Sequence, residues 1–526
     1  MSQPGHATPE GTAAYAARFT GRAGGAAAFA FTPLGTTGLV VSRLGFGGYR
    51  VDDRTLDHRA ALERSLASGS NLIDTSTNYT DGGSERLVGA VLREEAGRGR
   101  LAREAVVVVS KVGYVQGQNL ALAQAREAAG QPFPEMVKYM DGCWHCLHPE
   151  FLDDQLGRSL ERLDLRTLDV CLLHNPEYFF SDALHRGQGR DQASLARLRD
   201  EFYRRLREAF RFFEAQAAAG RLVWYGVSSN TVARPAGEAE ATSLAHMLEA
   251  AREAGGPGHR FRVLQLPMNL VESAGALDPT EGGETVLGLA ARERIGVLVN
   301  RPLNAIAGAA MLRLADVPVP PPVVGVDGQR VVLAALEAEF RRDIAPEIQV
   351  GEGSLQPGEF FRWSDELPGV LRQVKGLDHW RQVEAHMLLP AVNQVVSELD
   401  RALRDDAARR WRDWRARYLP ELQRFVEELR RQAALKSRAA VEALERAVDP
   451  LLPDEQREES LSRKALWVLA STPGVTTVLI GMRTPAYVED ALGVLRWEPL
   501  AEPRRVYEAV RALGERGAER RPTSRA

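Results

Sequence analysis

Four side chains of this sequence, Asp74, Tyr79, Lys111 and His174, are of types that can act together on a carbonyl group. A hydride that reaches a carbonyl carbon leaves an alkoxide, and a phenol can supply the proton that this alkoxide needs. The ordinary phenol pKa of about 10 makes it a slow acid at neutral pH, but a neighbouring ammonium favours the phenolate and lowers that pKa. The sequence therefore suggests Tyr79 as the proton donor and Lys111 as the group that activates it.

The other two side chains have supporting parts in this chemistry. Asp74 can keep Lys111 charged and oriented, and His174 can hydrogen-bond the carbonyl oxygen and hold a substrate in line. All four lie where apolar segments end: Asp74 and Tyr79 follow residues 72–73, Lys111 follows four valines, and His174 closes 168–174. They can meet if these segments are neighbouring strands whose carboxyl ends share one mouth.

The chain alternates short apolar segments with longer amphipathic ones, which predicts strands followed by helices. Eight such units indicate a parallel sheet closed into a (β/α)8 TIM barrel, an α/β fold. The alternative is an open doubly wound sheet, but the segment 45–50, GFGGYR, matches its glycine-rich phosphate loop poorly. The predicted strands occupy 43–48, 71–74, 105–111, 168–174, 222–230, 262–269, 296–304 and 475–483.

The predicted domains follow from this pattern and from the places where it stops. Residues 29–44 read as a hairpin that plugs the bottom of the barrel, and the Ala- and Gly-rich start of the chain is expected to be disordered. In chain order we expect a disordered tail (1–28), barrel strands one to seven (29–315), a helical insertion (316–456), the rest of the barrel with a C-terminal helix (457–516) and a second tail (517–526).

The insertion begins with a proline-rich segment at 315–328 and continues with helices expected near 381–418 and 420–447. Trp411, Trp414 and Tyr418 share one helical face, which is typical of a packing surface rather than a ligand site. Because the insertion follows the seventh strand, it should emerge on the catalytic face. The sequence favours a helical subdomain that acts as a lid, with homo-oligomer assembly as the alternative.

Several segments together resemble the aldo-keto reductase superfamily, whose members are (β/α)8 enzymes that use a nicotinamide cofactor. The resemblance runs over about 34–312 and 455–500 and is carried by NLIDTSTNYTDGGSERLVGAVL, SLERLDLRTLDVCLLHNPE, GRLVWYGVSSN and GVTTVLIGMRTPAYVEDAL, which stand in the family's order. It implies that Asp74, Tyr79, Lys111 and His174 form the catalytic tetrad. One departure lies at the seventh strand, where Asn300 and Arg301 replace the more usual aromatic residue and serine.

The resemblance also implies the positions that bind cofactor and substrate. Substrate contacts are expected from Tyr49, Trp144 and His174. The cofactor-binding residues are expected to be Gly48, Tyr49, Arg50, Asp74, Ser228, Ser229, Gln265, Pro302, Leu303, Gly481, Arg483, Tyr487, Glu489 and Asp490. Among them, Ser228, Ser229 and Gln265 match positions that hold the nicotinamide carboxamide, and the segment from 481 to 490 matches the part around the adenosine phosphate.

These observations predict an NADP(H)-dependent oxidoreductase that interconverts an aldehyde, ketone or sugar with its alcohol, with Tyr79 as general acid and base. The forked cation of Arg483 favours the 2′-phosphorylated nucleotide, and NAD(H) is the alternative cofactor. The alternative function is a nucleotide-binding sensor or scaffold that uses the barrel without turnover.

Composition and cysteine content bear on the possible partners, the cellular compartment and metal binding. A formal net charge of −3 argues against nucleic acid as a partner, and no apolar run reaches the roughly 18 residues of a membrane helix. Three cysteines suggest a reducing, cytoplasmic setting. Cys143, His145, Cys146 and His148 could ligate a metal, but they lack a distant second pair, so we expect a loop at the rim of the site and no metal.

Overall fold

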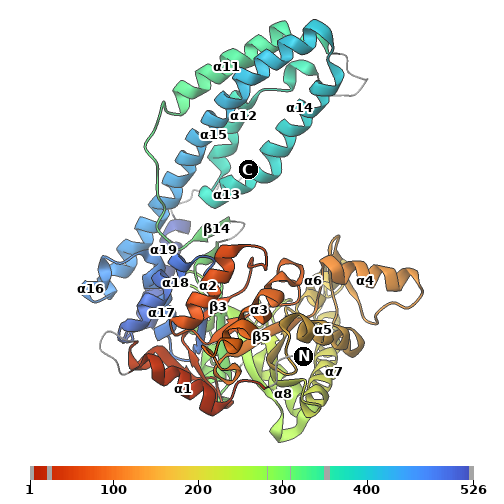
Figure 1. The fold of residues 1–526 in the computed structure, drawn as a ribbon, viewed down its shortest axis with the longest axis vertical. Helices are drawn as coiled ribbons and strands as arrows, with labels where there is room; N and C mark the ends of the chain where they lie inside the picture. The colour runs from red at the N-terminus through yellow and green to blue at the C-terminus, as the bar shows by residue number, and fades with distance from the viewer. Residues whose placement is uncertain (1–4, 21–25, 281, 308–309, 349–355, 520–526) are drawn as a thin grey trace. The chain divides into compact units, whose positions relative to one another are not determined.

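The computed structural model describes residues 5–20, 26–280, 282–307, 310–348 and 356–519 (Figure 1). The chain divides into two compact units. The first comprises Met1–Ala305 and Pro450–Ala526, and the second comprises Ile306–Asp449. No helix among the described residues is long and apolar enough to cross a membrane.

The first unit is built on a closed barrel of eight parallel strands, in the order β10-β11-β12-β15-β3-β4-β5-β9. Every predicted strand is present, which confirms the barrel. The valine run shows why: both faces of its strand are covered, and Val106, Val107, Val108 and Val109 are all fully buried. The strands are β3 (Leu44–Gly47), β4 (Leu72–Asp74), β5 (Val107–Val112), β9 (Leu168–His174), β10 (Leu222–Ser228), β11 (Phe261–Pro267), β12 (Gly296–Asn300) and β15 (Thr477–Ile480).

A helix follows each strand, and local sequence signals fix where several of these helices begin. Pro149 opens α5 directly after His148, whose side chain accepts a hydrogen bond from the N–H of Glu150. Asp191 and Ser194 form a reciprocal capping box at the start of α7. The barrel helices are α2 (Leu56–Ala67), α3 (Gly83–Gly97), α5 (Pro149–Leu163), α7 (Gln192–Ala218), α8 (Leu244–Gly255), α10 (Val286–Arg292), α17 (Leu461–Ser471) and α18 (Pro485–Leu492).

The predicted hairpin closes the amino-terminal end of the barrel. Strands β1 (Phe31–Pro33) and β2 (Val40–Ser42) pair in antiparallel register. Leu34, Leu39 and Val41 join one buried cluster with residues of the barrel strands. Gly296, the first residue of β12, has no room for a Cβ beside Leu34, so the hairpin lies at the end of the barrel opposite the mouth.

The prediction of a disordered tail over 1–28 is wrong for the described residues 5–20. They contain helix α1 (Pro9–Phe19), whose Tyr15 is 1% exposed. The Tyr15 hydroxyl donates to the carbonyl oxygen of Leu66, and the N–H of Ala7 donates to Asp169 Oδ1 at 2.6 Å. These contacts give the segment a buried face that its Ala- and Gly-rich composition conceals. Residues 1–4 and 21–25 lie outside the described part.

Two segments that do not belong to the barrel pattern directly follow the strands that carry Lys111 and His174. After β5 comes a three-stranded antiparallel sheet of β6 (Tyr114–Val115), β8 (Cys143–His145) and β7 (Val137–Met140), with α4 (Gly117–Ala128) between β6 and β7. After β9 comes the short helix α6 (Tyr178–His185). The sequence indicated two long loops here but not that the first one is a small sheet.

The second unit is helical and has a core of its own. In it α11 (Val326–Asp343) packs along α15 (Asp405–Val448), and α12 (Trp363–Gln373), α13 (Leu377–Val383) and α14 (Leu389–Ala402) complete the unit (Figure 1). Trp411, Trp414 and Tyr418 are buried in one cluster with Phe340 and Trp380. The aromatic stripe is therefore a packing surface, as predicted.

Two expectations about element boundaries are corrected. The break expected near residue 419 does not occur, because α15 is a single helix of 44 residues that continues through Pro420. Buried residues on both sides of that proline, Tyr418 and Leu422, pack into the same core and hold the helix together. The break lies instead at Leu403, whose backbone is extended. The last helix, α19, spans Pro503–Glu519 and so runs past the predicted end at 516, and residues 520–526 lie outside the described part.

Candidate active site

Lys111 is the centre of the group of four residues found in the sequence. Its Nζ lies 2.7 Å from Asp74 Oδ2, 2.8 Å from the carbonyl oxygen of Thr75 and 3.1 Å from the hydroxyl oxygen of Tyr79. An ammonium carries three protons, so these partners account for all of its donor capacity. The side chain is 0% exposed, and the structure thus holds one cation rigidly between an acid and a phenol.

The strands and one tight turn bring these residues together. Asp74 is the last residue of β4 and pairs with Val109 of β5, two residues before Lys111. After β4 the chain turns, and this turn brings the hydroxyl of Tyr79 to the Lys111 side chain at the end of β5. Thr80 and Asp81 follow it with positive φ angles of 46° and 54°, and the Thr80 hydroxyl pins the turn to the carbonyl oxygen of Val51 at 2.6 Å.

Burial controls the titration of this group. Burial lowers the pKa of Lys111, but the Asp74 carboxylate and the Tyr79 phenol outweigh it, and the net pKa is raised. Burial also raises the pKa of Tyr79, and the opposing effect of Lys111 is smaller. Lys111 thus lowers the pKa of Tyr79, as expected, but the effect of burial is larger and the net pKa is raised. The ammonium already shares its charge with Asp74, so it does not compensate for the desolvation of a phenolate.

His174 closes β9 and lies edge-on to the phenol, with ring centroids 5.9 Å apart and an interplanar angle of 80°. Its Nδ1 lies 3.1 Å from the hydroxyl oxygen of Ser76, which is 2.7 Å from Asn78 Oδ1. Burial, and then Lys111 and His145, lower the pKa of His174 well below its usual 6.5. The ring is therefore neutral at pH 7 and can form hydrogen bonds without adding a charge.

Two residues behind His174 were not predicted to take part in the site. His145 Nε2 donates to the carbonyl oxygen of His174 at 2.7 Å, and the ring of Tyr114 packs edge-on against His174 at 4.6 Å. Burial lowers the pKa of His145 to about 4, so it stays neutral in this role. In the sequence, His145 stands out only because it lies between Cys143 and Cys146. Trp144, the predicted substrate contact, is its neighbour in β8 and lies 4.5 Å from the ammonium of Lys138.

The other three residues considered as metal ligands have separate surroundings. Cys143 is buried in β8, the Cys146 thiol lies 3.4 Å from the carbonyl oxygen of Pro134, and His148 caps α5. In the described part of the chain, no group of three or more His, Cys, Asp or Glu residues is placed to hold a metal ion. The segment is part of the small sheet beside the site.

A second chain of hydrogen bonds connects Asp74 to the strands on the far side of the mouth. Gln265, in β11, donates from Nε2 to Asp74 Oδ1 at 2.8 Å. Its Oε1 accepts from the Ser228 hydroxyl at 3.2 Å and from Asn300 Nδ2 at 3.1 Å. Ser229, just after β10, donates from its N–H to the carbonyl oxygen of Gln265 at 2.9 Å, and its hydroxyl is 2.9 Å from the Thr242 hydroxyl. The predicted carboxamide positions therefore share one polar network with the tetrad, and Asn300 belongs to it.

The loop after β3 lines the open side of the mouth. The N–H of Gly48 donates to the carbonyl oxygen of Asp74 at 2.7 Å, and a Cβ at Gly48 would collide with the hydroxyl of Ser84. Tyr49 is 61% exposed and packs edge-on against Tyr79 with ring centroids 5.3 Å apart. Arg50 has a positive φ of 61° and lies over the ring of Tyr49. The phenol of Tyr79 is thus reached past an exposed aromatic ring.

The turn after β12 carries the residues that depart from the expected pattern. Arg301 adopts a positive φ of 54° and pairs with Glu272 at 3.1 Å. Pro302 is buried and Leu303 is half-buried in the same turn. Asn300 and Arg301 are therefore held by contacts within the protein. They place an amide and a guanidinium at positions where the family resemblance implied an aromatic residue and a serine.

The positions predicted for the far end of the cofactor surround the start of α18. Thr484 caps this helix by accepting from the N–H of Tyr487. Arg483 is half-buried beside the cap, and Tyr487 is 55% exposed. The two acids turn towards arginines of the protein, as Glu489 lies 2.8 Å from Arg64 and Asp490 Oδ1 lies 4.0 Å from Arg463 Nε. Gly481 is exposed at the end of β15.

Comparison with known proteins finds a family that part of the chain resembles. Residues 43–251 match the model of the Aldo/keto reductase family. This part of the chain is similar to the family. The match covers the segments that carry Tyr79, Lys111 and His174.

A curated relative matches part of the chain. Over 150 residues, 27% of this chain, it is 31% identical to the NADH-specific methylglyoxal reductase of Escherichia coli. The chain spans 40% of the length of that protein.

Two solved structures align with most of the chain at low sequence identity. The aldo-keto reductase from Bacillus halodurans, in its holo form, has 15% identity and a TM-score of 0.43, with coverage of 92% of this chain and 95% of that one. The glycerol dehydrogenase from Gluconobacter oxydans has 16% identity and a TM-score of 0.45, with coverage of 95% and 100%.

The sequence analysis did not identify one buried carboxyl group near the site. Glu177 follows His174 by three positions and is 5% exposed. Its Oε1 accepts from the N–H of Asn230 at 2.7 Å, and its buried Oε2 has no hydrogen-bond partner in the described part of the chain. Burial raises its pKa to about 7, although Asn230 and the nearby Ser229 oppose this. The charged and titratable groups that face it are Arg234, Tyr114 and Tyr178.

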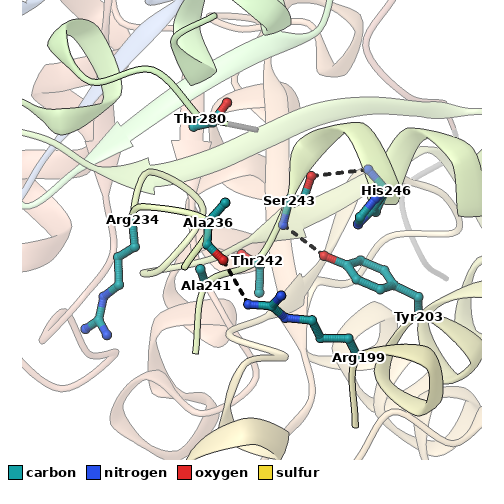
Figure 2. Close-up of a pocket in the computed structure, with 9 residues that line it drawn as sticks. All are labelled: Arg199, Tyr203, Arg234, Ala236, Ala241, Thr242, Ser243, His246 and Thr280. Atoms are coloured by element: carbon teal, nitrogen blue, oxygen red, sulfur yellow. Dashed lines mark hydrogen bonds between the residues drawn. The ribbon is translucent and has the colours of Figure 1, made fainter. Parts of the chain in front are cut away.

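A pocket of about 100 Å³ lies outside the tetrad, between α7, α8 and the loop after β10 (Figure 2). Arg199 donates to the carbonyl oxygen of Ala236, and the hydroxyl of Tyr203 accepts from the N–H of Ser243 (Figure 2). Thr242 lines the pocket and bonds to Ser229. These hydrogen bonds hold the loop after β10 in place. The residues around the pocket therefore help to position Ser229.

Proposed function

We propose that the protein is an oxidoreductase that interconverts a small carbonyl compound, an aldehyde, ketone or sugar, and the corresponding alcohol, using NADP(H) in preference to NAD(H). The observation that carries this proposal is the buried ammonium of Lys111, which contacts both Asp74 and the hydroxyl of Tyr79. The match of residues 43–251 to the Aldo/keto reductase family model supports it. The Escherichia coli relative is named as a methylglyoxal reductase, which is consistent with a small carbonyl substrate.

In the proposed mechanism Tyr79 is the general acid. When bound, the reduced nicotinamide ring supplies the hydride that adds to the carbonyl carbon. The proton of the Tyr79 hydroxyl passes to the carbonyl oxygen, and Lys111 stabilises the phenolate that remains. Asp74 keeps Lys111 charged. In alcohol oxidation the phenolate takes the hydroxyl proton back. A positioned general acid contributes roughly 10²–10⁴ in rate.

The raised pKa of Tyr79 suits the reductive direction, because the phenol holds its proton at neutral pH until an alkoxide forms. His174 is neutral, so its part is to hydrogen-bond the substrate oxygen and hold it beside Tyr79. Tyr49 is the exposed ring at the mouth and is proposed, with Trp144, to contact the rest of the substrate.

The residues present fit a nicotinamide nucleotide. Gly481, just after β15, has open space where a Cβ would stand, and Asn300 Oδ1 is a buried acceptor without a partner in the described part. Ser228, Ser229 and Gln265 would hold the nicotinamide end. Helix N-termini attract phosphate groups, and the start of α18, with Arg483 beside it, would hold the adenosine phosphate.

The decisive experiment is a screen of the purified protein for oxidation of NADPH and NADH with aldehydes, ketones and sugars, and for the reverse reaction with alcohols. Turnover that depends on Tyr79 supports the proposal. The second candidate is a nucleotide-binding sensor or scaffold, which the separate core of the helical unit favours. Tight nucleotide binding without turnover of any substrate would favour this candidate.

A further inference from the structure

The ring of His174 has two nitrogen atoms with different surroundings. Nδ1 lies 3.1 Å from the hydroxyl oxygen of Ser76. Nε2 has no hydrogen-bond partner in the described part of the chain, yet it is not one of the solvent-inaccessible polar atoms. Nε2 is therefore open at the end of β9, where a substrate atom can reach it. A neutral imidazole carries one proton, so the nitrogen that holds this proton decides what Nε2 can bind.

A short chain of hydrogen bonds determines where that proton lies. Asn78 donates from Nδ2 to Gln116 Oε1 at 3.0 Å, so its Oδ1 faces the Ser76 hydroxyl, at 2.7 Å. The Ser76 hydroxyl has one proton, and two acceptors compete for it: Asn78 Oδ1 and, at 3.3 Å, the carbonyl oxygen of Lys111. Neither of these oxygens carries a proton. The contact between Ser76 and His174 therefore requires that Nδ1 donates.

The resulting neutral ring has its proton on Nδ1 and a lone pair on Nε2. Burial, and then Lys111 and His145, lower the pKa of His174, so the ring carries no second proton at pH 7. Nε2 thus accepts hydrogen bonds and cannot donate one to a carbonyl oxygen. The substrate oxygen that His174 binds must bring its own proton, which makes it a hydroxyl. A substrate ammonium is disfavoured because the cation of Lys111 already lies in the site.

We propose that His174 Nε2 accepts a hydrogen bond from a hydroxyl on the carbon next to the carbonyl, so that the substrates are hydroxyaldehydes, hydroxyketones or open-chain sugars. The inference rests on the proposed function, which brings the carbonyl oxygen to the hydroxyl of Tyr79. The rings of Tyr79 and His174 lie edge-on with centroids 5.9 Å apart, so the two substrate oxygens that they bind must be close neighbours. Ser76 and Asn78 are positioning residues, because they act through the tautomer of His174.

The kinetic test uses three aldehydes that differ in one group. Glycolaldehyde has the hydroxyl. Methoxyacetaldehyde keeps the oxygen and its inductive effect but lacks the proton, and propanal controls for size with a methyl group in place of the hydroxyl. We expect kcat/KM for glycolaldehyde to exceed both other values by about tenfold, the effect of leaving one hydrogen-bond acceptor in the site unpaired.

Three variants connect this preference to the hydrogen-bond chain. Ser76→Ala removes the acceptor for Nδ1, so the ring can protonate Nε2 instead and most of the preference should be lost. Asn78→Asp keeps an oxygen that accepts from Ser76 and should retain it. Thr77→Val is the matched control and should also retain it, because the Thr77 hydroxyl lies 3.1 Å from the carbonyl oxygen of Lys111 but makes no hydrogen bond to His174 in the described part. A ratio of two substrates on one protein is insensitive to a general loss of activity.

Nitrogen NMR of isotope-labelled protein reads the tautomer without any substrate. We expect a protonated Nδ1 and an unprotonated Nε2 at His174 in the wild type, in Asn78→Asp and in Thr77→Val, and a loss of this pattern in Ser76→Ala. The spectrum of His174→Gln, which lacks this ring, assigns the signals. Thermal melting checks that each variant folds.

Four results would overturn the inference while leaving the proposed function intact. These are a protonated Nε2 in the wild type, equal kcat/KM for glycolaldehyde and methoxyacetaldehyde, a preference that survives in Ser76→Ala, and no turnover of glycolaldehyde by a protein that reduces other carbonyl compounds. A protein that turns over no aldehyde, ketone, sugar or alcohol would overturn the proposed function and this inference together.

Discussion

The Nζ of Lys111 lies 3.1 Å from the hydroxyl oxygen of Tyr79 and 2.7 Å from Asp74 Oδ2. The cation is therefore shared between the carboxyl group of Asp74 and the phenol of Tyr79. This arrangement leaves Tyr79 protonated and places a positive charge where a phenolate would form. It makes Tyr79 the residue on which the proposed chemistry depends most.

Replacing Tyr79 with Phe removes the proton donor and keeps the ring. We expect kcat for carbonyl reduction to fall by at least about a hundredfold, because general acid catalysis contributes on that scale. The dissociation constant of NADP(H) should change little. Tyr139→Phe, a change of the same kind at a ring that packs against Tyr178, is the control and should keep near wild-type turnover. Full activity of Tyr79→Phe would exclude it as the acid.

The buried carboxyl of Glu177 should make stability depend on pH. Its pKa is about 7 in the folded protein and starts from an ordinary value of 4.5. The folded state thus holds this proton more tightly than the unfolded chain does. The stabilisation is complete below about pH 4.5 and is lost as the pH rises through about 7.

Glu177→Gln keeps an acceptor for the N–H of Asn230 and removes the titration. Relative to wild type, the variant should therefore gain on the order of 2 kcal/mol of unfolding free energy between about pH 5 and about pH 8. Urea unfolding at the two pH values measures the difference. Glu489→Gln, a change at an exposed surface pair, is the control. A difference that does not vary with pH would show that Glu177 does not titrate as described.

The sequence predicted the barrel because its strands carry strong local signals. The four valines before Lys111 and the run that ends at His174 are buried on both faces, so their hydrophobicity and their ends could be recognised without the fold. The tetrad followed, because side chains at the carboxyl ends of parallel strands must meet. The segment 9–19 was missed because its burial depends on long-range contacts, among them those of Tyr15 and Phe19 with Phe31, which its Ala- and Gly-rich composition does not signal.

The residues that the sequence did not predict act through long-range contacts. His145 reaches His174 only because an antiparallel sheet folds inside a loop, and nothing in its local sequence announces this. The sign of the pKa shift of Tyr79 depends on how deeply the pair of Lys111 and Asp74 is buried. The role of Pro420 also depends on tertiary packing, since Tyr418 and Leu422 hold α15 continuous across it.

Arg483 should decide which nucleotide binds. A guanidinium beside the capped start of α18 can pair with a 2′-phosphate, and a hydrogen bond to a charged group contributes about 1.5–3 kcal/mol. Arg483→Ala should therefore weaken NADP(H) by roughly 10- to 100-fold and leave NAD(H) almost unchanged. Arg64→Ala is the control. Arg64 lies in α2 and pairs with Glu489 of α18, so this variant also removes an arginine that contacts that helix. Equal losses for both nucleotides, measured by fluorescence titration, would contradict this role.

The helical unit should be removable without unfolding the barrel. Its core, which includes Trp411, Trp414 and Trp380, is made of residues from the unit itself. The helical unit is one continuous insertion between β12 and α17 in the sequence. Replacing residues 306–449 with a Gly-Ser linker therefore removes all of it. We expect the shortened protein to keep a cooperative melting transition and near wild-type affinity for NADP(H).

The effect on catalysis then separates the two roles proposed for this unit. A lid that excludes water and completes the pocket predicts a higher KM for the carbonyl substrate and a lower kcat in the shortened protein. An assembly surface predicts a smaller mass in light scattering with little change in either constant. Trp414→Ala in the full chain is the companion variant. Truncating a buried Trp costs about 3–5 kcal/mol, so it should melt the helical unit before the barrel and reproduce the effect of the deletion. We favour the lid, and unaltered substrate kinetics in both variants would reject it.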